Sequence, residues 1–338
     1  MHENPNLSRR ATSFARHCLA SALLLVLVLS IFSVAGCRRS ANVKGKTLRV
    51  VFSAAPDAID TFGYRMVDIL REQGIDVKVT LADGGSKAVQ AILAGQADIG
   101  ASQLDDVING GLVAFALSRP KNTYAMVVQK NIKTMADLKG KVIGEADPGS
   151  AVNVISDAVM EKNGLPASQV KHVSIGGNGA RAAALVAGKV DAIWTYGSNY
   201  LKLRAAGFPT LTTVPKELPG IHDDMWCAKK EWLDKNGDLA VAVAKAQLQA
   251  AKWFREKPEE WLKLAAEKVD GLDQNVAKEL YTVLKDMDAY PLNGLMTADT
   301  VMDTFNFLSK AGAVPNKPMD SWATLKYMDQ ARKELGIK

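Results

Sequence analysis

The same ten-residue pattern occurs twice in this chain and constrains its fold more than any other feature. Residues 91–100 read AILAGQADIG and residues 184–193 read ALVAGKVDAI. Both contain an Ala-Gly pair, two variable residues, an aspartate and a further apolar residue. Glycine closes a helix at low cost because it readily adopts the left-handed conformation, and apolar residues around the aspartate are typical of a buried strand. Each copy therefore predicts a turn from a helix into a strand.

Each copy lies in a longer unit of the same kind. A glycine-rich loop precedes each predicted helix, at residues 83–86 and at residues 176–179. Short apolar stretches alternate with helical spacing over residues 48–117, and the alternation starts again at about residue 123. Such alternation is typical of α/β proteins with mostly parallel sheets, so its restart predicts two similar lobes.

Beyond about residue 226 the periodicity is almost entirely helical. Helical spacing runs through residues 238–255, 258–268, 274–286, 297–310 and 325–335, with prolines between several of these segments. Helices without strands cannot form a sheet-based domain of their own. We therefore expect the C-terminal third of the chain to pack on the first lobe.

The N-terminal residues have the pattern of a secretory signal. Basic residues at positions 9, 10, 16 and 17 precede 19 uncharged residues, 18–36, which end in small side chains before Cys37. This ending resembles the lipobox of bacterial lipoproteins. We expect residues 1–36 to be a signal peptide and Cys37 to carry lipid. Residues 37–46 would tether the protein to the periplasmic or cell-surface side of a membrane. A retained membrane helix is the alternative, because the uncharged stretch is nearly long enough to span.

Composition argues against several classes of function. Removal of residues 1–36 takes away three arginines and one glutamate, so the net charge falls from +6 to +4, with no block of like charges. Nucleic acid is therefore not an expected partner. After Cys37 the sequence has one cysteine, Cys227, and two histidines, His172 and His222, without HxxxH or CxxC spacing. We expect no internal disulfide, no metal site, no cofactor and no histidine-based catalytic triad.

The order of the motifs resembles that of bacterial ABC-importer solute-binding proteins, in the branch that includes nitrate, sulfonate, taurine and thiamine-precursor binders. The resemblance covers roughly residues 46–270. The segments that carry it are residues 81–100, 134–144, 149–150, 184–194, 218–220, 229–233 and 250–253. It implies a type II periplasmic-binding fold with two lobes and two crossings, and a monomer that closes on a small solute and presents it to a membrane permease.

The resemblance also implies the extent of each lobe. Lobe one would comprise residues 44–122 and 228–338, and lobe two residues 123–227. The two crossings between the lobes would lie near residues 119–128 and near residues 224–228.

Candidate ligand-binding residues follow from the positions of the motifs. In open α/β sheets, ligands bind where strands end and helices begin, because unpaired N–H groups and the helix dipole lie there. The candidates at this edge are Ser53, Asp57, Gly85, Ser86, Ser102, Gln103, Ser150, Asn178, Trp194, Tyr196 and Trp226. The structural alternatives are helix capping for Asp57 and Ser150, and core packing for the aromatic residues.

The sequence leaves the charge of the solute open. Helix N-termini favour an anion such as nitrate or a sulfonate, and Arg181 is the best candidate for an acid partner. Asp57 and Asp83 instead favour a solute with hydrogen-bond donors or positive charge, as in an amino-sulfonate or an aminopyrimidine. The sequence does not decide between these two kinds of solute.

Two other classes of function compete with an importer receptor. The first is a receptor that serves a sensor or another type of transporter, which would use the same binding chemistry. The second is an enzyme, because the same fold family includes a thiamine-precursor synthase that depends on histidine and a cysteine-rich iron motif. This sequence lacks that motif. We therefore expect a binding protein rather than an enzyme.

Overall fold

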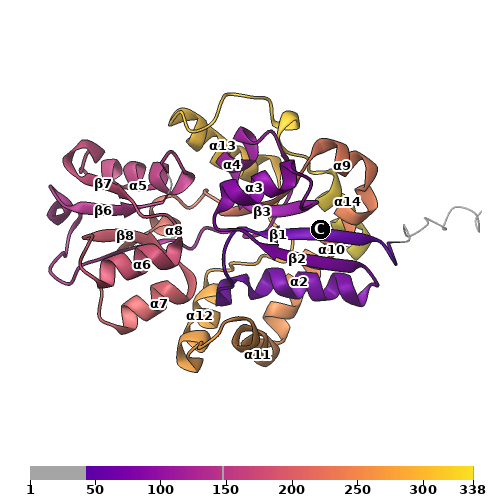
Figure 1. The fold of residues 1–338 in the computed structure, drawn as a ribbon, viewed down its shortest axis with the longest axis horizontal. Coiled ribbons are helices and arrows are strands. Elements are labelled where there is room, and N and C mark those ends of the chain that lie inside the picture. The colour runs from indigo at the N-terminus through magenta and orange to yellow at the C-terminus, as the bar shows by residue number, and fades with distance from the viewer. Residues whose placement is uncertain (1–42, 147, 338) are drawn as a thin grey trace, which may run out of the picture. The chain divides into compact units, whose positions relative to one another are not determined.

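The computed structural model describes residues 43–146 and 148–337. The expected signal peptide and the lipidated Cys37 lie outside the described residues. Within them, the main strands form two five-stranded sheets, each covered by helices (Figure 1). We call the unit built on the first sheet lobe one and the unit built on the second sheet lobe two. The predicted α/β class and two-lobe architecture are confirmed.

The sheet of lobe one has the strand order β2-β1-β3-β10-β4. Its strands are β1 (Thr47–Phe52), β2 (Asp76–Leu81), β3 (Ile99–Gln103), β4 (Val113–Leu117) and β10 (Asp224–Ala228). β1 is parallel to β2 and β3, whereas β10 is antiparallel to β3 and β4. Residues 224–228, where we expected the second crossing, are thus an inner strand of lobe one. The chain has already returned from lobe two when β10 begins.

The sheet of lobe two repeats this plan with the order β7-β6-β8-β5-β9. Its strands are β5 (Ala125–Val128), β6 (Val142–Glu145), β7 (Lys171–Ser174), β8 (Ala192–Thr195) and β9 (Thr210–Thr213). β6 is parallel to β7 and β8, and β5 is antiparallel to β8 and β9. In each sheet, therefore, the antiparallel strand is the one that enters directly from the other lobe.

The helices of the two lobes follow their parallel strands. Those of lobe one that precede the first crossing are η1 (Ala58–Asp60), α2 (Thr61–Glu72), α3 (Gly85–Leu93) and α4 (Leu104–Asn109). Those of lobe two are η2 (Met135–Leu138), α5 (Ala151–Lys162), η3 (Ala167–Gln169), α6 (Asn178–Val186), α7 (Gly197–Ala205) and α8 (Val214–Glu217). No helix in the described ranges combines the length and apolar character that crossing a bilayer requires.

The repeated sequence stretch has the same structural role in both lobes. Gly95 and Gly188 follow α3 and α6 with φ angles of +74° and +66°, which only glycine adopts without strain. In each copy, the aspartate after this glycine accepts a hydrogen bond from the backbone of the neighbouring strand. Asp98 accepts a hydrogen bond from the backbone N–H of Arg49 at 2.8 Å, and Asp191 accepts one from that of Val142 at 2.9 Å. The pattern recurs because each lobe needs the same helix end and the same strand anchor.

The C-terminal third is helical, as predicted, and packs on lobe one. Its helices are α9 (Lys230–Lys235), α10 (Gly237–Glu256), α11 (Pro258–Lys268), α12 (Gln274–Asp286), α13 (Ala298–Lys310), η4 (Met319–Ser321) and α14 (Lys326–Leu335). α10 lies against α2 and α14, and the buried Gln247 of α10 donates a hydrogen bond to the carbonyl of Leu117 in β4. α12 additionally contacts α7 of lobe two, where Arg204 pairs with Glu279 at 2.9 Å.

Candidate ligand-binding cleft

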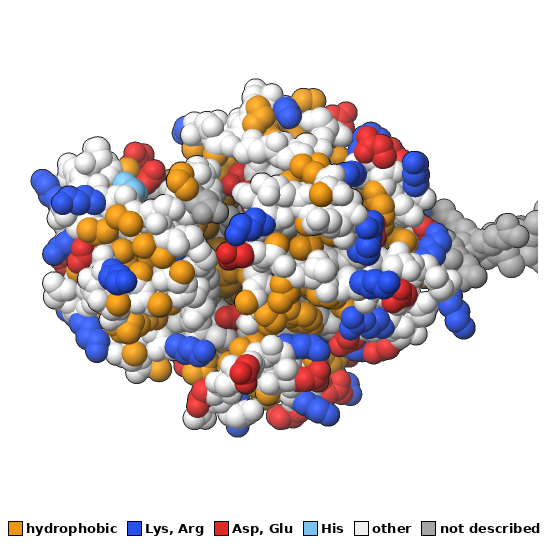
Figure 2. All heavy atoms as spheres, viewed as in Figure 1, with side chains coloured by type: hydrophobic (Ala, Val, Ile, Leu, Met, Phe, Trp, Pro, Cys, Tyr) orange, Lys and Arg blue, Asp and Glu red, His pale blue; other side chains and the backbone are white. Residues whose placement is uncertain are grey.

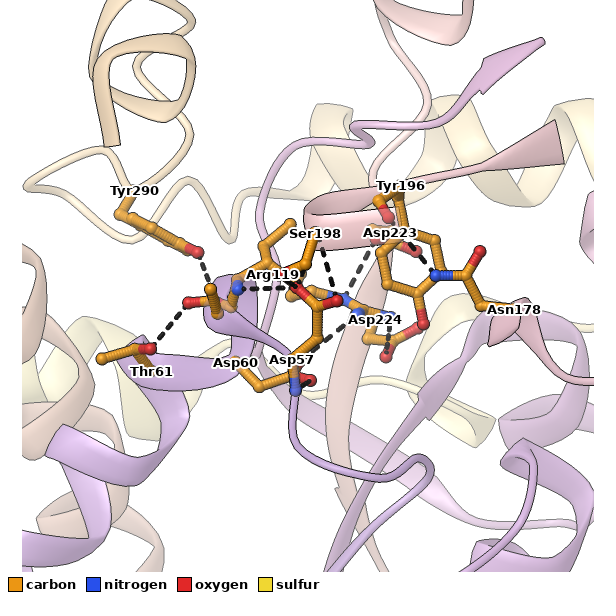
Figure 3. Close-up of polar contacts among 12 residues, drawn as sticks. Asp57, Asp60, Thr61, Arg119, Asn178, Tyr196, Ser198, Asp223, Asp224 and Tyr290 are labelled. Carbon is orange, nitrogen blue, oxygen red and sulfur yellow. Dashed lines mark hydrogen bonds and ion pairs between the residues drawn. The ribbon is translucent and has the colours of Figure 1, made fainter. Parts of the chain in front are cut away.

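A carboxylate of lobe one holds the N-terminus of a lobe-two helix. Acidic side chains lie along the groove between the lobes (Figure 2). Asp57 accepts hydrogen bonds from the backbone N–H of Ser198 at 3.0 Å and from its hydroxyl at 3.1 Å, at the start of α7 (Figure 3). The same carboxylate accepts from the N–H of Ile59 and so caps η1 of its own lobe. Asp57 therefore caps one helix in each lobe. Its burial raises the pKa of the carboxyl, and the hydrogen bonds from the two helix N-termini act in the opposite direction.

The close approach of Asp57 depends on a glycine. Gly197 has a φ angle of +59°, and a Cβ atom at this position would lie 2.3 Å from Oδ1 of Asp57. Any side chain here would therefore displace the carboxylate from the helix N-terminus.

A second carboxylate of lobe one caps another lobe-two helix. Asp105 accepts a hydrogen bond from the backbone N–H of Ala151, the first residue of α5, at 3.0 Å. Ser150 stands at the N-cap position, but its hydroxyl contacts Asn153 and makes no capping bond. Asp105 is buried, and its burial raises the pKa of its carboxyl group. The cap that we expected from Ser150 is thus supplied by the other lobe.

Arg119, in the first crossing, is the cation at the centre of the interlobe region. Its guanidinium forms ion pairs with Asp224 at 2.5 Å, with Asp223 at 3.0 Å and with Asp60 at 3.4 Å (Figure 3). It also lies 4.9 Å from the ring centroid of Tyr196, in cation–π geometry. Residues from both crossings and from both lobes therefore meet at one arginine.

This cluster has more acid than base. Burial raises the pKa of Asp60 to about 7, although Arg119 acts in the opposite direction. Burial also raises the pKa of Asp223, again against the effect of Arg119. Burial lowers the pKa of the guanidinium, but Asp223 and Asp224 outweigh this and raise it overall. One arginine is thus shared by three carboxyl groups, and the region retains a negative character.

The raised pKa of Asp60 makes the stability of the protein depend on pH. In the unfolded chain this carboxyl has its ordinary pKa of 3.8, so between about pH 4 and pH 7 the folded form holds a proton that the unfolded form has released. Stability from this group is present below pH 4 and is lost as the pH rises to 7. Asp60→Asn should therefore gain stability relative to the wild type over this range, by on the order of 1 kcal/mol per pH unit.

Urea unfolding of both proteins at several pH values tests this expectation. Asparagine keeps an oxygen that can accept the hydrogen bond from the N–H of Asp57, so the η1 cap is retained. Asp76→Asn, at an exposed carboxylate of β2, is the control, and its difference from the wild type should stay nearly constant. A flat difference between Asp60→Asn and the wild type would contradict the assignment.

Three of the predicted residues gather around Asp106 of α4. Its carboxylate accepts hydrogen bonds from the hydroxyl of Ser86 at 2.7 Å and from that of Ser102 at 3.0 Å. A Cβ atom on Gly85 would lie 2.0 Å from the same carboxylate, so glycine is required there. The structure brings Gly85, Ser86 and Ser102 together, but around a carboxylate that sequence reasoning did not single out.

Ser53 and Trp226 line a pocket at the end of β1, together with Arg119 and Asp224. Aromatic side chains fill part of this pocket. Phe52 stacks on Tyr64 with ring centroids 4.9 Å apart and meets Trp226 edge-on at 5.6 Å. Trp226 is only 1% exposed, so it acts as a wall of the pocket from within the core of lobe one.

The predicted residues of lobe two have different surroundings. Asn178 donates to the carbonyl of Tyr196 at 3.3 Å and accepts from the hydroxyl of Thr195 at 2.8 Å, so it fixes the turn before α7. Trp194 is fully buried in the lobe-two core. Arg181, the expected acid partner, donates to the backbone carbonyls of Trp194 and Gly176. Its guanidinium is therefore engaged with the backbone.

Sequence reasoning missed most of the acidic centre. The missed residues are Asp60, Asp105, Asp106, Arg119, Asp223 and Asp224. Gln103, which was predicted, belongs with them, because it lies opposite Asp224 in the sheet and lowers the pKa of the Asp223 carboxyl. The available signal was the acidic pair Asp223-Asp224, which lies at the start of β10, together with Arg119 in the first crossing.

The two sheets of equal topology, joined by two crossings and facing each other across a cleft, define the two-lobe fold of periplasmic binding proteins. The chain belongs to the family described as NMT1/THI5 like, which matches residues 70–261, more than half of its length.

Known relatives are consistent with this family. The formylaminopyrimidine-binding protein of Halalkalibacterium halodurans is 24% identical over 287 residues, which cover 79% of this chain and 86% of that protein. The alkanesulfonate-binding protein SsuA from Xanthomonas axonopodis pv. citri, solved bound to MOPS, superposes with a TM-score of 0.67. It is 19% identical over 83% of this chain and 99% of its own. The desulfurization enzyme DSZB has a TM-score of 0.62 and 15% identity over 86% of this chain and 99% of its own. The solved structures share the fold with this chain.

Proposed function

We propose that this protein is the solute-binding receptor of an ABC importer. In this proposal it captures a small solute between its lobes and presents the closed form to a membrane permease. The cleft takes a solute with several hydrogen-bond donors or a positive charge, of aminopyrimidine type, rather than a sulfonate or nitrate.

The observation that carries the proposed solute class is the charge of the cleft. Asp57, Asp105 and Asp106 lie on the lobe-one side, and Asp60, Asp223 and Asp224 surround the one arginine of the cluster. An anionic solute would be repelled by these carboxylates. To pair with Arg119, it would have to break the ion pairs that the arginine makes with them. A donor-rich solute would instead supply hydrogen bonds to groups that are costly to leave buried and unpaired.

The relative with the matching chemistry supports the same choice. The protein from Halalkalibacterium halodurans is named for binding a formylaminopyrimidine. Aromatic walls such as those of Phe52 and Trp226 suit a flat ring of this kind.

Membrane anchoring is part of the proposal through Cys37, which would carry lipid after removal of residues 1–36. The protein would then act as a monomer beside its permease, on the periplasmic or cell-surface side. Mass spectrometry of the protein from membranes would detect the lipid on Cys37.

We infer a binding role rather than catalysis. Cys227 is the one cysteine within the described ranges, and it is fully buried in β10, where its thiol contacts the carbonyl of Gly100. Burial raises the pKa of this thiol above its ordinary value, so it remains protonated and is a poor nucleophile. It packs as a small apolar residue.

Thermal unfolding in the presence of candidate solutes tests the proposal. Aminopyrimidines are expected to raise the melting temperature by a few degrees, because a solute at ~100 times its Kd adds about 2.7 kcal/mol. Alkanesulfonates and nitrate should produce no shift, and taurine, with one ammonium group, is an intermediate probe. Asp106→Asn should weaken the aminopyrimidine effect, whereas Asp68→Asn, on α2 and paired with Arg71, should not. A shift with sulfonates alone would reverse the proposed solute class.

A further inference from the structure

Three side chains from successive elements of lobe two converge outside the cluster around Arg119. Glu145 is the last residue of β6, Asp157 lies in α5 and His172 lies in β7. One ligand atom of each lies within 4.8 Å of those of the other two. We propose that Glu145, Asp157 and His172 form a binding site for a divalent transition-metal ion of the zinc type.

The hydrogen bonds of His172 support a cation between it and Glu145. Its Nδ1 lies 3.2 Å from Oε1 of Glu145, and its Nε2 lies 3.2 Å from the carbonyl oxygen of Ala167. A neutral imidazole has one N–H, so when Nε2 donates to this carbonyl, the lone pair of Nδ1 faces a carboxylate. A metal ion bound by Nδ1 removes this repulsion. Histidines that bind metals commonly donate their other ring N–H to a backbone carbonyl in the same way.

The two carboxylates offer oxygens that lack a hydrogen-bond partner. Only 2% of the Glu145 side chain is exposed, and its Oε1 accepts from the hydroxyl of Ser156 at 3.0 Å. Oε2 of Glu145 and Oδ1 of Asp157 are buried without a hydrogen-bond partner. In the described part of the chain, neither carboxylate pairs with lysine or arginine. Their ion pairs are with His172, where Glu145 faces Nδ1 at 3.2 Å and Asp157 faces Nε2 at 3.8 Å.

A buried carboxylate without a cation is costly, and Glu145 is such a group, whereas 46% of the Asp157 side chain is exposed. Burial raises the pKa of both Glu145 and Asp157, and each lies close enough to another acidic group to add to this effect. His172 acts in the opposite direction on both groups. A divalent ion would supply positive charge beside Oε2 of Glu145 and Oδ1 of Asp157, which have no hydrogen-bond partner.

The donor set selects the type of metal. One imidazole and two carboxylates match the ligands that Zn²⁺ binds at about 2.0–2.2 Å, and three protein ligands leave one position for water. Mg²⁺ and Ca²⁺ prefer oxygen ligands alone, so the imidazole disfavours them. The His172 side chain is 36% exposed, which gives the ion a route from solvent.

Calorimetric titration of the purified full-length protein with Zn²⁺ tests the proposal, and Co²⁺ provides an absorption spectrum from the same site. We expect one saturable site that His172→Ala and Asp157→Asn each weaken by about 10–100-fold. Asp68→Asn, at a partly exposed helical aspartate of lobe one, should bind as the wild type does. Since the chain also has His2, His17 and His222, the variants decide the assignment rather than binding alone.

Two results would overturn the site. One is Zn²⁺ binding that both variants leave unchanged, which would place the ion elsewhere on the chain. The other is the absence of any saturable binding, which would mean that His172 only contacts Glu145 and Ala167 without holding a metal.

Discussion

Replacement of Arg119 by methionine is expected to lower the free energy of unfolding by about 3–5 kcal/mol at pH 8. The guanidinium is paired with Asp60, Asp223 and Asp224, and only 11% of its side chain is exposed. Its removal leaves three carboxyl groups buried together without a cation, and the cost of such uncompensated charge exceeds the cost of lost packing.

The loss should shrink as the pH falls. Without Arg119 the pKa values of these carboxyls rise further, so protonation neutralises them at mildly acidic pH. Urea unfolding at pH 5 and at pH 8 measures both values, and the difference between variant and wild type should be smaller at pH 5. If the methionine variant does not fold, Arg119→Lys keeps the charge without the planar fork and should show an intermediate loss.

A second arginine provides the matched control. Arg204 pairs with Glu279 at 2.9 Å between lobe two and α12, but both side chains are more than 40% exposed. Exposed ion pairs contribute little, so Arg204→Met should cost no more than about 1 kcal/mol at either pH. An Arg119→Met variant that loses as little as Arg204→Met would contradict a central structural role for Arg119.

The fold was predictable because its signals are local. The left-handed glycines at positions 95 and 188 and the aspartates that follow them lie in one short stretch each, and each stretch acts within its own lobe. The position of β10 was not predictable in this way. Residues 224–228 read as an apolar connection, and only pairing with β3 and β4, distant in sequence, makes them a strand of lobe one.

The cleft was predictable in outline and not in its chemistry. Motif positions led to Asp57, Ser86 and Ser102, because polar residues at strand ends and helix starts share one edge of a sheet. The groups that contact these residues come from segments that are distant in sequence and meet only in the folded protein. Asp105 caps a helix of the other lobe, and Arg119 pairs with the two acids at the start of β10. Neither relation is encoded in local spacing.

The cluster proposed to bind metal is likewise formed by segments that are separate in the sequence. His172 has no metal-ligand spacing with any neighbour in sequence, and sequence analysis therefore predicted no metal. Glu145 and Asp157 reach it from a strand and a helix that flank β7 in space.

Replacement of Asp57 by alanine is expected to open the lobes and to weaken solute binding about tenfold or more. The hydrogen bonds that Asp57 accepts from Ser198 exist only when the lobes meet, so they contribute to the closed state alone. Hydrogen bonds to a charged group contribute about 1.5–3 kcal/mol, and loss of this amount from the closed state raises the apparent Kd by the corresponding factor.

Gly197→Ala tests the same contact from the other lobe. Its Cβ would displace the Asp57 carboxylate from α7, yet Asp57 would still be able to cap η1. Asp57→Ala loses the cap and the interlobe contact together. A property that both variants share therefore reports on the interlobe contact, whereas one seen only in Asp57→Ala reports on the cap. Small-angle X-ray scattering measures the opening, and calorimetry with the solute identified by thermal unfolding measures the affinity.

Ser198→Ala measures how much the serine hydroxyl alone contributes to the contact with Asp57. It removes the hydroxyl at 3.1 Å but keeps the backbone N–H at 3.0 Å, so its effect on affinity should be smaller than that of Asp57→Ala. Unchanged scattering and unchanged affinity in both Asp57→Ala and Gly197→Ala would mean that closure does not depend on this carboxylate. The interlobe contacts of Asp105 and Arg119, with the exposed pair of Arg204 and Glu279, would then have to supply the energy of closure.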